Sequence, residues 1–578
     1  MIKSTLLRTR AWRCQRMKFS NTLRGYQRQW LPADITAGLI VTILLIPQSI
    51  AYALLAGLPP VAGLYASLLP LAVYAFLGTS PTLAIGPVAI VSLMTLDALL
   101  PFAAAGTAEF AAHATVLAGL TGIWLLVFFA VGLGSWTSFM SHSVISGFTS
   151  AAAIVIIINQ LKYFTGIDIP HGGGSWFPIA YTLEHWHEAV PMALMMSVAS
   201  ILVLIFWQGY VPKIMSRWKM SAIILPFVTK SGPLIIVVVG ILLTQVTDLP
   251  ISTVGDIPAG LPSLQIPSFS DVDWRSLIAP AFVIALIAYL ENISIAGAMA
   301  MQQSHRISPN QELLALGVAN LSAAISQAYP ISGSFGRSMV NMSAGARSQV
   351  AGLVTLISVI FVCLFASHLF VTLPHAVLAA INTIAVWSLI RWQDGWRAWR
   401  FQYSDGLIWL LTFMGVLIWG AETGIVIGIG ISLILYLRRT SKPHVVEIGR
   451  LGDSERLRSI ERHQVETSPE LLIVRIDENL YFANSQYLEN YIYDRISPKS
   501  SVKHVIIVGS AINYIDFCGF ESLERILEQL RGQGIQLHFA EFKGPVMDQL
   551  GKTNLLTQLQ PGQIFMTASD ALRTLGHL

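Results

Sequence analysis

Residues 44–53 read LLIPQSIAYA, residues 59–67 read PPVAGLYAS, and the same stretch continues to the pair Gly86-Pro87. No Asp, Glu, Lys or Arg occurs between residues 35 and 96. A helix needs about 20 apolar residues to cross the hydrocarbon core of a bilayer, so this run is long enough for more than one crossing. The run is continuously apolar rather than alternating, which excludes a membrane β-barrel and predicts transmembrane helices.

Charge divides the 578-residue chain into three parts. The first 34 residues hold eight Lys or Arg and one acid, whereas only 26 charged side chains lie between residues 35 and 437. Residues 438–578 hold 33, a density close to the roughly 25% typical of soluble proteins. We therefore expect a membrane domain followed by a soluble domain. The basic N-terminal stretch indicates a positive-inside signal and not nucleic-acid binding.

The sequence lacks the motifs that mark several classes of function. The three cysteines cannot form a disulfide framework, and no Cys/His spacing predicts a metal site, so we expect neither metal nor cofactor. Neither HExxH, GxSxG, a Walker loop nor a kinase motif occurs, which argues against an enzyme. The long basic N-terminus also lacks the short apolar segment and cleavage site of a secretory leader.

Hydropathy predicts fourteen membrane segments. They lie at 35–55, 59–79, 86–101, 112–133, 140–161, 188–209, 222–246, 277–301, 311–328, 334–346, 350–370, 375–390, 405–420 and 422–437. With this count, the N-terminal arginines and the basic clusters near residues 213–219, 391–400 and 438–442 all fall on one side. The positive-inside rule makes that side the cytoplasm. We expect a multi-pass protein of the cell inner (plasma) membrane with both termini cytoplasmic.

Two of these segments are too short to cross a bilayer and occupy equivalent places, third and tenth. Gly86-Pro87 opens the third, and Ser-Gly-Ser-Phe-Gly at 332–336 opens the tenth. Such interruptions leave half-helices with free N-terminal amides. Paired interruptions in two halves are typical of a transporter built from seven-plus-seven inverted repeats with a binding site at the midplane. The alternative is ordinary close packing of glycine-rich helices.

The charged tail has the pattern of a small α/β domain. Residues 471–476 and 504–508 predict buried strands, residues 519–531 have apolar positions at helical spacing, and 535–540 predicts another strand. We expect a cytoplasmic N-terminus at 1–33, a transmembrane transport domain at 34–438, a linker at 439–469 and the tail domain at 470–578.

The stretch 44–87 resembles the signature of the sulfate permease (SulP, SLC26) family. Two further stretches agree, SGSFGRS at 332–338 with the following Asn341, and LENISIA at 290–296, and the tail resembles the family's STAS domain. The resemblance implies fourteen segments in inverted repeats, divided into a core and a gate subdomain. It also implies an alternating-access, elevator-type anion transporter that forms a homodimer.

The resemblance places the anion between the third and tenth half-helices. The implied substrate-binding residues are Gln48, Tyr52, Val88, Ala89, Ser92, Ser334, Phe335, Gly336 and Arg337. Independently of the family, two facing helix N-termini present free N–H groups and positive dipole ends, which suit an oxyanion. Gln48 and Tyr52 lie four residues apart on one helix face, although such polar groups also serve in helix packing.

Arg337 and Glu291 are charges inside predicted membrane segments, where a charge is costly and usually functional. Arg337 is expected to assist anion binding, and Glu291 is expected to carry a coupled proton. The alternative for both residues is a static ion pair with each other.

The function expected from these observations is proton-coupled sulfate uptake. The identity of the transported anion stays open, because a transporter of the same fold could carry dicarboxylate or bicarbonate at a similar site. An anion channel-like member is a further alternative from another functional class.

Overall fold

The computed structural model describes residues 26–134, 141–170, 174–217, 228, 231–247, 250–255, 258–268, 270, 272–303, 305–452, 456–496 and 501–577. The basic stretch up to residue 25, residue 140 and residues 222–227 of the predicted segments lie outside the described residues. The chain divides into two compact units, Met1–Ile429 and Gly430–Leu578, and each is described by itself.

Each of the fourteen predicted membrane segments coincides with helix. In chain order the helices are α3 (Leu31–Leu55), α4 (Pro60–Tyr65) with α5 (Leu69–Leu77), α6 (Ala89–Leu99), α7 (Ala108–Val131), α8 (His142–Asn159), α11 (Pro191–Arg217), α13 (Gly232–Val246), α14 (Ile278–Gln303), α15 (Pro309–Ile325), α16 (Phe335–Ser343), α17 (Val350–Phe361) with η5 (Val362–Ala366) and η6 (Ser367–Phe370), α18 (His375–Trp387), α20 (Tyr403–Trp419) and α21 (Ala421–Ser441). Within the described residues, nine helical stretches are long and apolar enough to span a bilayer.

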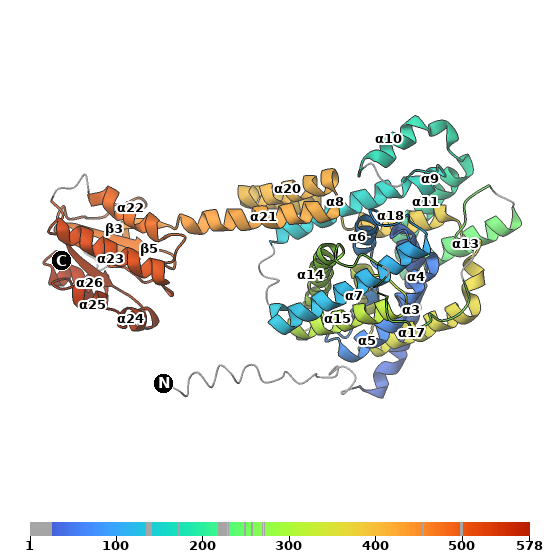
Figure 1. The fold of residues 1–578 in the computed structure, drawn as a ribbon, viewed down its shortest axis with the longest axis horizontal. Coiled ribbons are helices and arrows are strands. Elements are labelled where there is room, and N and C mark those ends of the chain that lie inside the picture. Colours follow the sequence, from blue (N-terminus) through green and yellow to red (C-terminus); the bar gives the residue numbers. More distant parts are fainter. Residues whose placement is uncertain are drawn as a thin grey trace. The chain divides into compact units, whose positions relative to one another are not determined.

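The membrane unit packs as two groups of helices. In the first group, α7 and α5 lie against α15, and α3 lies against α17. In the second group, α8 lies against α20, and α11 lies against α18 (Figure 1). The two groups meet where α3 contacts α18 and α13, and where α6 contacts α8.

Two buried carboxylates join segments of the first group that are far apart in sequence. Glu312, in the first turn of α15, accepts hydrogen bonds from Tyr74 Oη at 2.8 Å, Thr79 N at 2.8 Å and Asn292 Nδ2 at 3.0 Å. Asp34, in the first turn of α3, accepts hydrogen bonds from the backbone and hydroxyl of Ser348. Buried charges need such donors, so both residues serve as structural links.

The two short segments meet through a two-stranded antiparallel ribbon. Strand β1 (Ile85–Gly86) pairs with β2 (Ser332–Gly333), with Ile85 opposite Gly333 and Gly86 opposite Ser332. Helix α6 begins three residues after β1, and α16 begins two residues after β2. The antiparallel pairing therefore brings the N-termini of two half-helices together from opposite directions.

The tail unit contains a six-stranded sheet in the order β4-β3-β5-β6-β7-β8. Its strands are β3 (Val445–Arg450), β4 (Leu457–Ser459), β5 (Leu471–Ile476), β6 (His504–Val508), β7 (Gln536–Ala540) and β8 (Ile564–Phe565). β5, β6, β7 and β8 run parallel, whereas β3 pairs antiparallel with both of its neighbours. Strands β5 and β6 have the predicted bounds.

Two apolar cores cover the two faces of this sheet. One face packs under α22 (Ser485–Ile496), α23 (Phe517–Gly532), α24 (Gly544–Leu550) and α25 (Leu555–Gln558). The other face packs under α26 (Ala568–Thr574). The prediction of a linker at 439–469 was wrong, because this segment contains β3 and β4. Val446 and Ile448 of β3 are buried in the second core, so the sheet gains apolar burial by taking up this segment.

Strands β6 and β7 carry a pair of histidines, of which His538 is buried and His504 is half-buried. His538 Nδ1 accepts the Gln563 amide at 3.1 Å, so its Nε2–H donates to His504 Nδ1, also at 3.1 Å. Both histidines are therefore neutral in the folded domain. The pKa of His538 is lowered from 6.5 to about 4, mainly because the ring is buried and to a smaller extent because His504 lies beside it.

Acidification should therefore destabilise the tail domain. Between pH 6.5 and 4 the unfolded chain binds a proton at His538 that the folded domain does not, so stability falls as pH falls. We expect protection of the β6 and β7 amides in the full-length protein to fall roughly tenfold from pH 7 to pH 5, after correction for intrinsic exchange. His538→Asn should lose much of this pH dependence, whereas His463→Asn, at an exposed histidine, should keep it. Equal pH dependence in both variants would contradict this account.

Candidate functional site

The N-termini of α6 and α16 form the floor of the site. Val88 caps α6 with extended backbone and without a side-chain hydrogen bond, so the first amides of α6 have no side-chain cap. At α16, Ser334 Oγ accepts the Arg337 amide at 3.5 Å, and Ser334 N donates to Ala84 O at 2.9 Å. Two helix N-termini thus direct positive partial charge to one place.

A cavity of about 660 Å³ opens in front of these N-termini. Its lining includes eight of the ten predicted site residues: Gln48, Tyr52, Val88, Ala89, Glu291, Ser334, Phe335 and Gly336. Gln48 and Tyr52 reach the cavity from α3, where Pro47 interrupts the helical hydrogen bonding one residue before Gln48. The structure therefore brings together polar groups from α3, α6, α14 and α16.

Arg337 lies behind this cavity and not on its surface. Its side chain is 1% exposed, Nη2 donates to Pro87 O at 2.8 Å, and Nη1 donates to Gln48 Oε1 at 3.5 Å. These bonds connect α16 to the chain that enters α6 and to the amide on α3. Because Gln48 Oε1 accepts from the guanidinium, the Gln48 Nε2 donor is left for a ligand in the cavity.

Gly86 makes this placement of Arg337 possible. Its φ of +143° is a conformation that residues with a Cβ rarely adopt, and an added Cβ would lie 3.3 Å from Arg337 Nη2. The ribbon's backbone therefore favours glycine at this position, and a Cβ here would also push the guanidinium away by a few tenths of an ångström.

Glu291 lines the same cavity from α14. Its Oε2 atom is buried and has no hydrogen-bond partner among the residues that the structure describes. No ion pair within 4 Å joins Glu291 to Arg337 in the described part of the chain, where the contacts of Arg337 are with Pro87 and Gln48. The geometry favours separate roles for these two residues over a static pair.

Ser92 stands apart from the other predicted residues. It lies one turn into α6, is fully buried, and its Oγ donates to Tyr329 Oη at 3.3 Å. Ser92 does not line the cavity, and its hydroxyl is already bonded to Tyr329.

Prediction from sequence missed the opposite wall of the cavity. This wall is formed by Leu204, Trp207, Gln208 and Pro212 of α11, Gly232 and Pro233 of α13, and Ile381, Ile384, Ala385, Val386, Ser388 and Leu389 of α18 and the residues after it. Gln208 could have indicated this wall from the sequence, because an amide in an apolar segment is costly unless it faces other polar groups or water.

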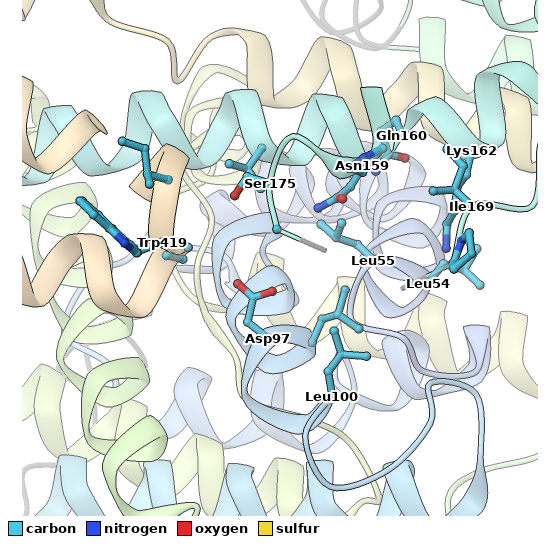
Figure 2. A pocket seen from close by; sticks show the side chains of 18 of the residues that line it. Leu54, Leu55, Asp97, Leu100, Asn159, Gln160, Lys162, Ile169, Ser175 and Trp419 are labelled. Carbon is cyan, nitrogen blue, oxygen red and sulfur yellow. The ribbon is translucent and has the colours of Figure 1, made fainter. Parts of the chain in front are cut away.

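A second cavity, of about 420 Å³, lies at the other ends of α3 and α6. Leu54 and Leu55 of α3 and Asp97 of α6 contribute to its lining. Figure 2 shows Asp97 on one side of this cavity and Asn159, Gln160 and Ser175 on the other. Helix α6 thus has its N-terminus at the first cavity and its C-terminus at the second.

Comparison with known proteins agrees with this arrangement. The model of the sulfate permease family matches residues 31–412, and that of the STAS domain matches residues 462–571. The chain is 33% identical to a protein of Arabidopsis thaliana described as probable sulfate transporter 4.2, over 96% of this chain and 83% of that protein. It is 32% identical to a probable sulfate transporter of Mycobacterium tuberculosis, over 95% of this chain and 96% of that protein.

The fold is also that of a solved anion transporter. The structure of murine solute carrier 26 family member A9 in the inward-facing state superposes with a TM-score of 0.88 at 23% identity, over 99% of this chain and 98% of that chain. A helical membrane domain with a C-terminal STAS domain, an interrupted pair of half-helices and these matches lead to one conclusion: the chain belongs to the sulfate permease (SulP/SLC26) family of membrane anion transporters and is not an enzyme.

Proposed function

We propose that this protein takes up sulfate together with protons. The observation that carries the proposal is the meeting of two half-helix N-termini, held by the β1–β2 ribbon, at a cavity that Gln48 and Glu291 also line. Sulfate has only acceptor oxygens, and this site offers amide donors, positive dipole ends and the buried charge of Arg337 behind them. The names of the relatives in Arabidopsis and Mycobacterium support sulfate as the cargo.

Glu291 supports the proton-coupling part of the proposal. It is the one carboxylate that lines the cavity among the residues described there, and its Oε2 atom has no protein partner among them. A carboxylate beside an anion repels it unless protonated, so binding of sulfate and binding of a proton favour each other. Bicarbonate and dicarboxylate stay as alternative cargo that the experiment below separates.

The two cavities support alternating access of the elevator type. The first group of helices carries α6 and α16, whereas the second provides α11 and α18 on the opposite wall. A displacement of the first group along the second would move the anion site from one cavity toward the other. The first cavity adjoins the ends of α11 and α18 that lead to the basic residues near 213 and 391, so it faces the cytoplasm under the positive-inside rule.

The same rule supports an orientation with both termini in the cytoplasm, and we propose the cell inner (plasma) membrane as the location. We include a homodimer in the proposal, with lipid bilayer, anion and protons as the other partners.

A ligand panel tests the substrate. Thermal stabilisation of the purified full-length protein should be largest with sulfate and small with bicarbonate, fumarate and uracil. Stabilisation follows the ratio of ligand concentration to Kd, so ligands at equal concentration can be ranked directly. A larger shift in melting temperature with bicarbonate or fumarate would identify that anion, and not sulfate, as the cargo. The absence of any shift would count against an anion site here.

Replacing Gly86 tests how the site is supported. Gly86→Ala should lower the melting temperature and also weaken sulfate binding about threefold to tenfold, because the new Cβ displaces Arg337. Gly106→Ala is the matched control, since Gly106 also has a positive φ of +83° but no atom lies within 4 Å of its added Cβ. The control should lose stability and keep its sulfate affinity. Equal affinity in both variants would show that Arg337 placement does not matter for binding.

A further inference from the structure

Helix α19 (Trp392–Phe401) connects two membrane helices, α18 and α20, and has an unusual surface. Trp392 and Trp396 are 56% and 62% exposed, and Trp399, three residues after Trp396, lies on the same face of the helix. Arg397 and Arg400 are exposed and three residues apart, so they form a second row beside the tryptophans. Two aligned rows, one aromatic and one basic, therefore run along this helix, and at its start the Trp392 ring also packs against aromatic rings of α20.

The remaining side of α19 is fixed to the protein. Gly395 lies so close to α20 that an added Cβ would be 2.7 Å from the Trp409 ring. Asp394 accepts a hydrogen bond from Ser146 Oγ of α8 at 3.2 Å and lies 3.8 Å from Arg391 Nη1. These contacts prevent rotation of α19 about its axis, so the aromatic and basic rows keep their outward direction.

The charge on this exposed side is not compensated locally. Asp394, the one acid of α19, is directed to Ser146 and Arg391. Within the residues that the structure describes, Arg397 and Arg400 form no ion pair with a carboxylate, and the Arg400 guanidinium lies 5.3 Å from the centre of the Trp396 ring. An arginine held over a tryptophan presents its remaining donors to a flat anionic surface.

The neighbouring helices place these rows at a membrane boundary. Trp387 at the end of α18 is 65% exposed and Tyr403 at the start of α20 is 63% exposed. Tryptophan and tyrosine concentrate where lipid tails meet headgroups, and arginine side chains extend from that level toward phosphate. A short amphipathic helix with such rows lies in the plane of the interface.

We propose that α19 lies in the membrane interface and that Arg397 and Arg400 bind the headgroup phosphates of anionic phospholipids. The aromatic row enters the acyl region beside them. This inference does not depend on the cargo or on proton coupling, because it rests on the outer surface of the second helix group.

Lipid retention by the full-length protein tests the proposal. The protein is purified from mixed micelles containing equal amounts of phosphatidylglycerol and phosphatidylcholine, and bound lipid is counted by native mass spectrometry. Wild type should retain phosphatidylglycerol selectively. The Arg397→Gln/Arg400→Gln variant should lose that selectivity about tenfold to thirtyfold, since each basic residue near an anionic surface contributes about 1 kcal/mol.

Matched variants separate this site from general charge. Arg458→Gln/Arg462→Gln removes two exposed arginines of the tail unit and should keep the wild-type selectivity. Equal loss in both double variants, or retention in the α19 variant, would overturn the proposal. Displacement of the lipid by inorganic phosphate would also overturn it, because the site would then be one for soluble phosphate. If the double α19 variant does not fold, the two single variants should each lose about threefold to fivefold.

Discussion

Glu291→Gln should abolish acid-driven accumulation of sulfate, while its sulfate affinity stays within about twofold of the wild-type affinity measured at a pH where Glu291 is protonated. A glutamine resembles the protonated acid in shape and charge but cannot release or take up a proton, so the anion site stays formed and coupling is lost. A proton moving down a gradient of one pH unit supplies about 1.4 kcal/mol, which corresponds to tenfold accumulation. Wild type should therefore gain roughly tenfold per pH unit for each coupled proton, and the variant should gain nothing.

The matched control for this change is Glu109→Gln, at an acidic residue in the first turn of α7 outside the cavity. It should retain gradient-driven uptake. Binding and uptake are measured on the same preparations, by thermal stabilisation and by labelled sulfate in proteoliposomes. A Glu291→Gln protein that still concentrates sulfate in response to a pH gradient would remove Glu291 from the proton pathway.

Arg337→Ala should weaken sulfate binding by roughly tenfold to a hundredfold. The change removes the donor to Pro87 O and the donor that orients Gln48, so the Gln48 amide is no longer held toward the cavity. Loss of one oriented hydrogen bond to a charged ligand costs about 1.5–3 kcal/mol. It also removes a positive charge directly behind the cavity. Arg337→Lys should recover part of the affinity, because lysine keeps the charge but cannot bond Pro87 O and Gln48 Oε1 at the same time with the geometry of a guanidinium.

Arg347→Ala provides the control, because the Arg347 side chain is exposed and it is the Arg347 backbone amide that donates to Asp34. It should leave affinity unchanged. A static Arg337–Glu291 pair makes a different prediction: both single variants would be unstable and the double variant Arg337→Ala/Glu291→Gln would be rescued. Such a rescue would contradict the separate roles assigned to the two residues.

The membrane segments and the central strands of the tail could be predicted because solvation dominates them. Runs without charge, such as residues 35–96, have no alternative to burial in lipid or protein. The buried strands Leu471–Ile476 and His504–Val508 are short continuous apolar runs, and the structure has the same bounds. The half-helices could be predicted because Gly86-Pro87 and the glycines near 333 are local signals that do not depend on distant contacts.

The remainder depends on residues far apart in the chain. The contact of Arg337 with Pro87 joins positions 250 residues apart, and nothing near Arg337 in the sequence shows that it would lie behind the cavity. Strand β3 was missed because Glu447 interrupts its apolar pattern, although Arg495 of α22 pairs with this glutamate at 3.4 Å. The cavity wall on α11 and α18 is apolar apart from Gln208 and Ser388, and an apolar side chain in a membrane helix gives no sign of whether it faces lipid or a cavity.

Uptake of labelled sulfate into proteoliposomes, with and without an acid-outside pH gradient, tests proton-coupled sulfate transport most directly. The membrane potential is held at zero in both conditions, so that the pH gradient is the only difference. We predict accumulation above equilibrium that requires the gradient, disappears with a protonophore and is competed by unlabelled sulfate. Sulfate entry that reaches only equilibrium, at the same rate with and without the gradient, would contradict the account.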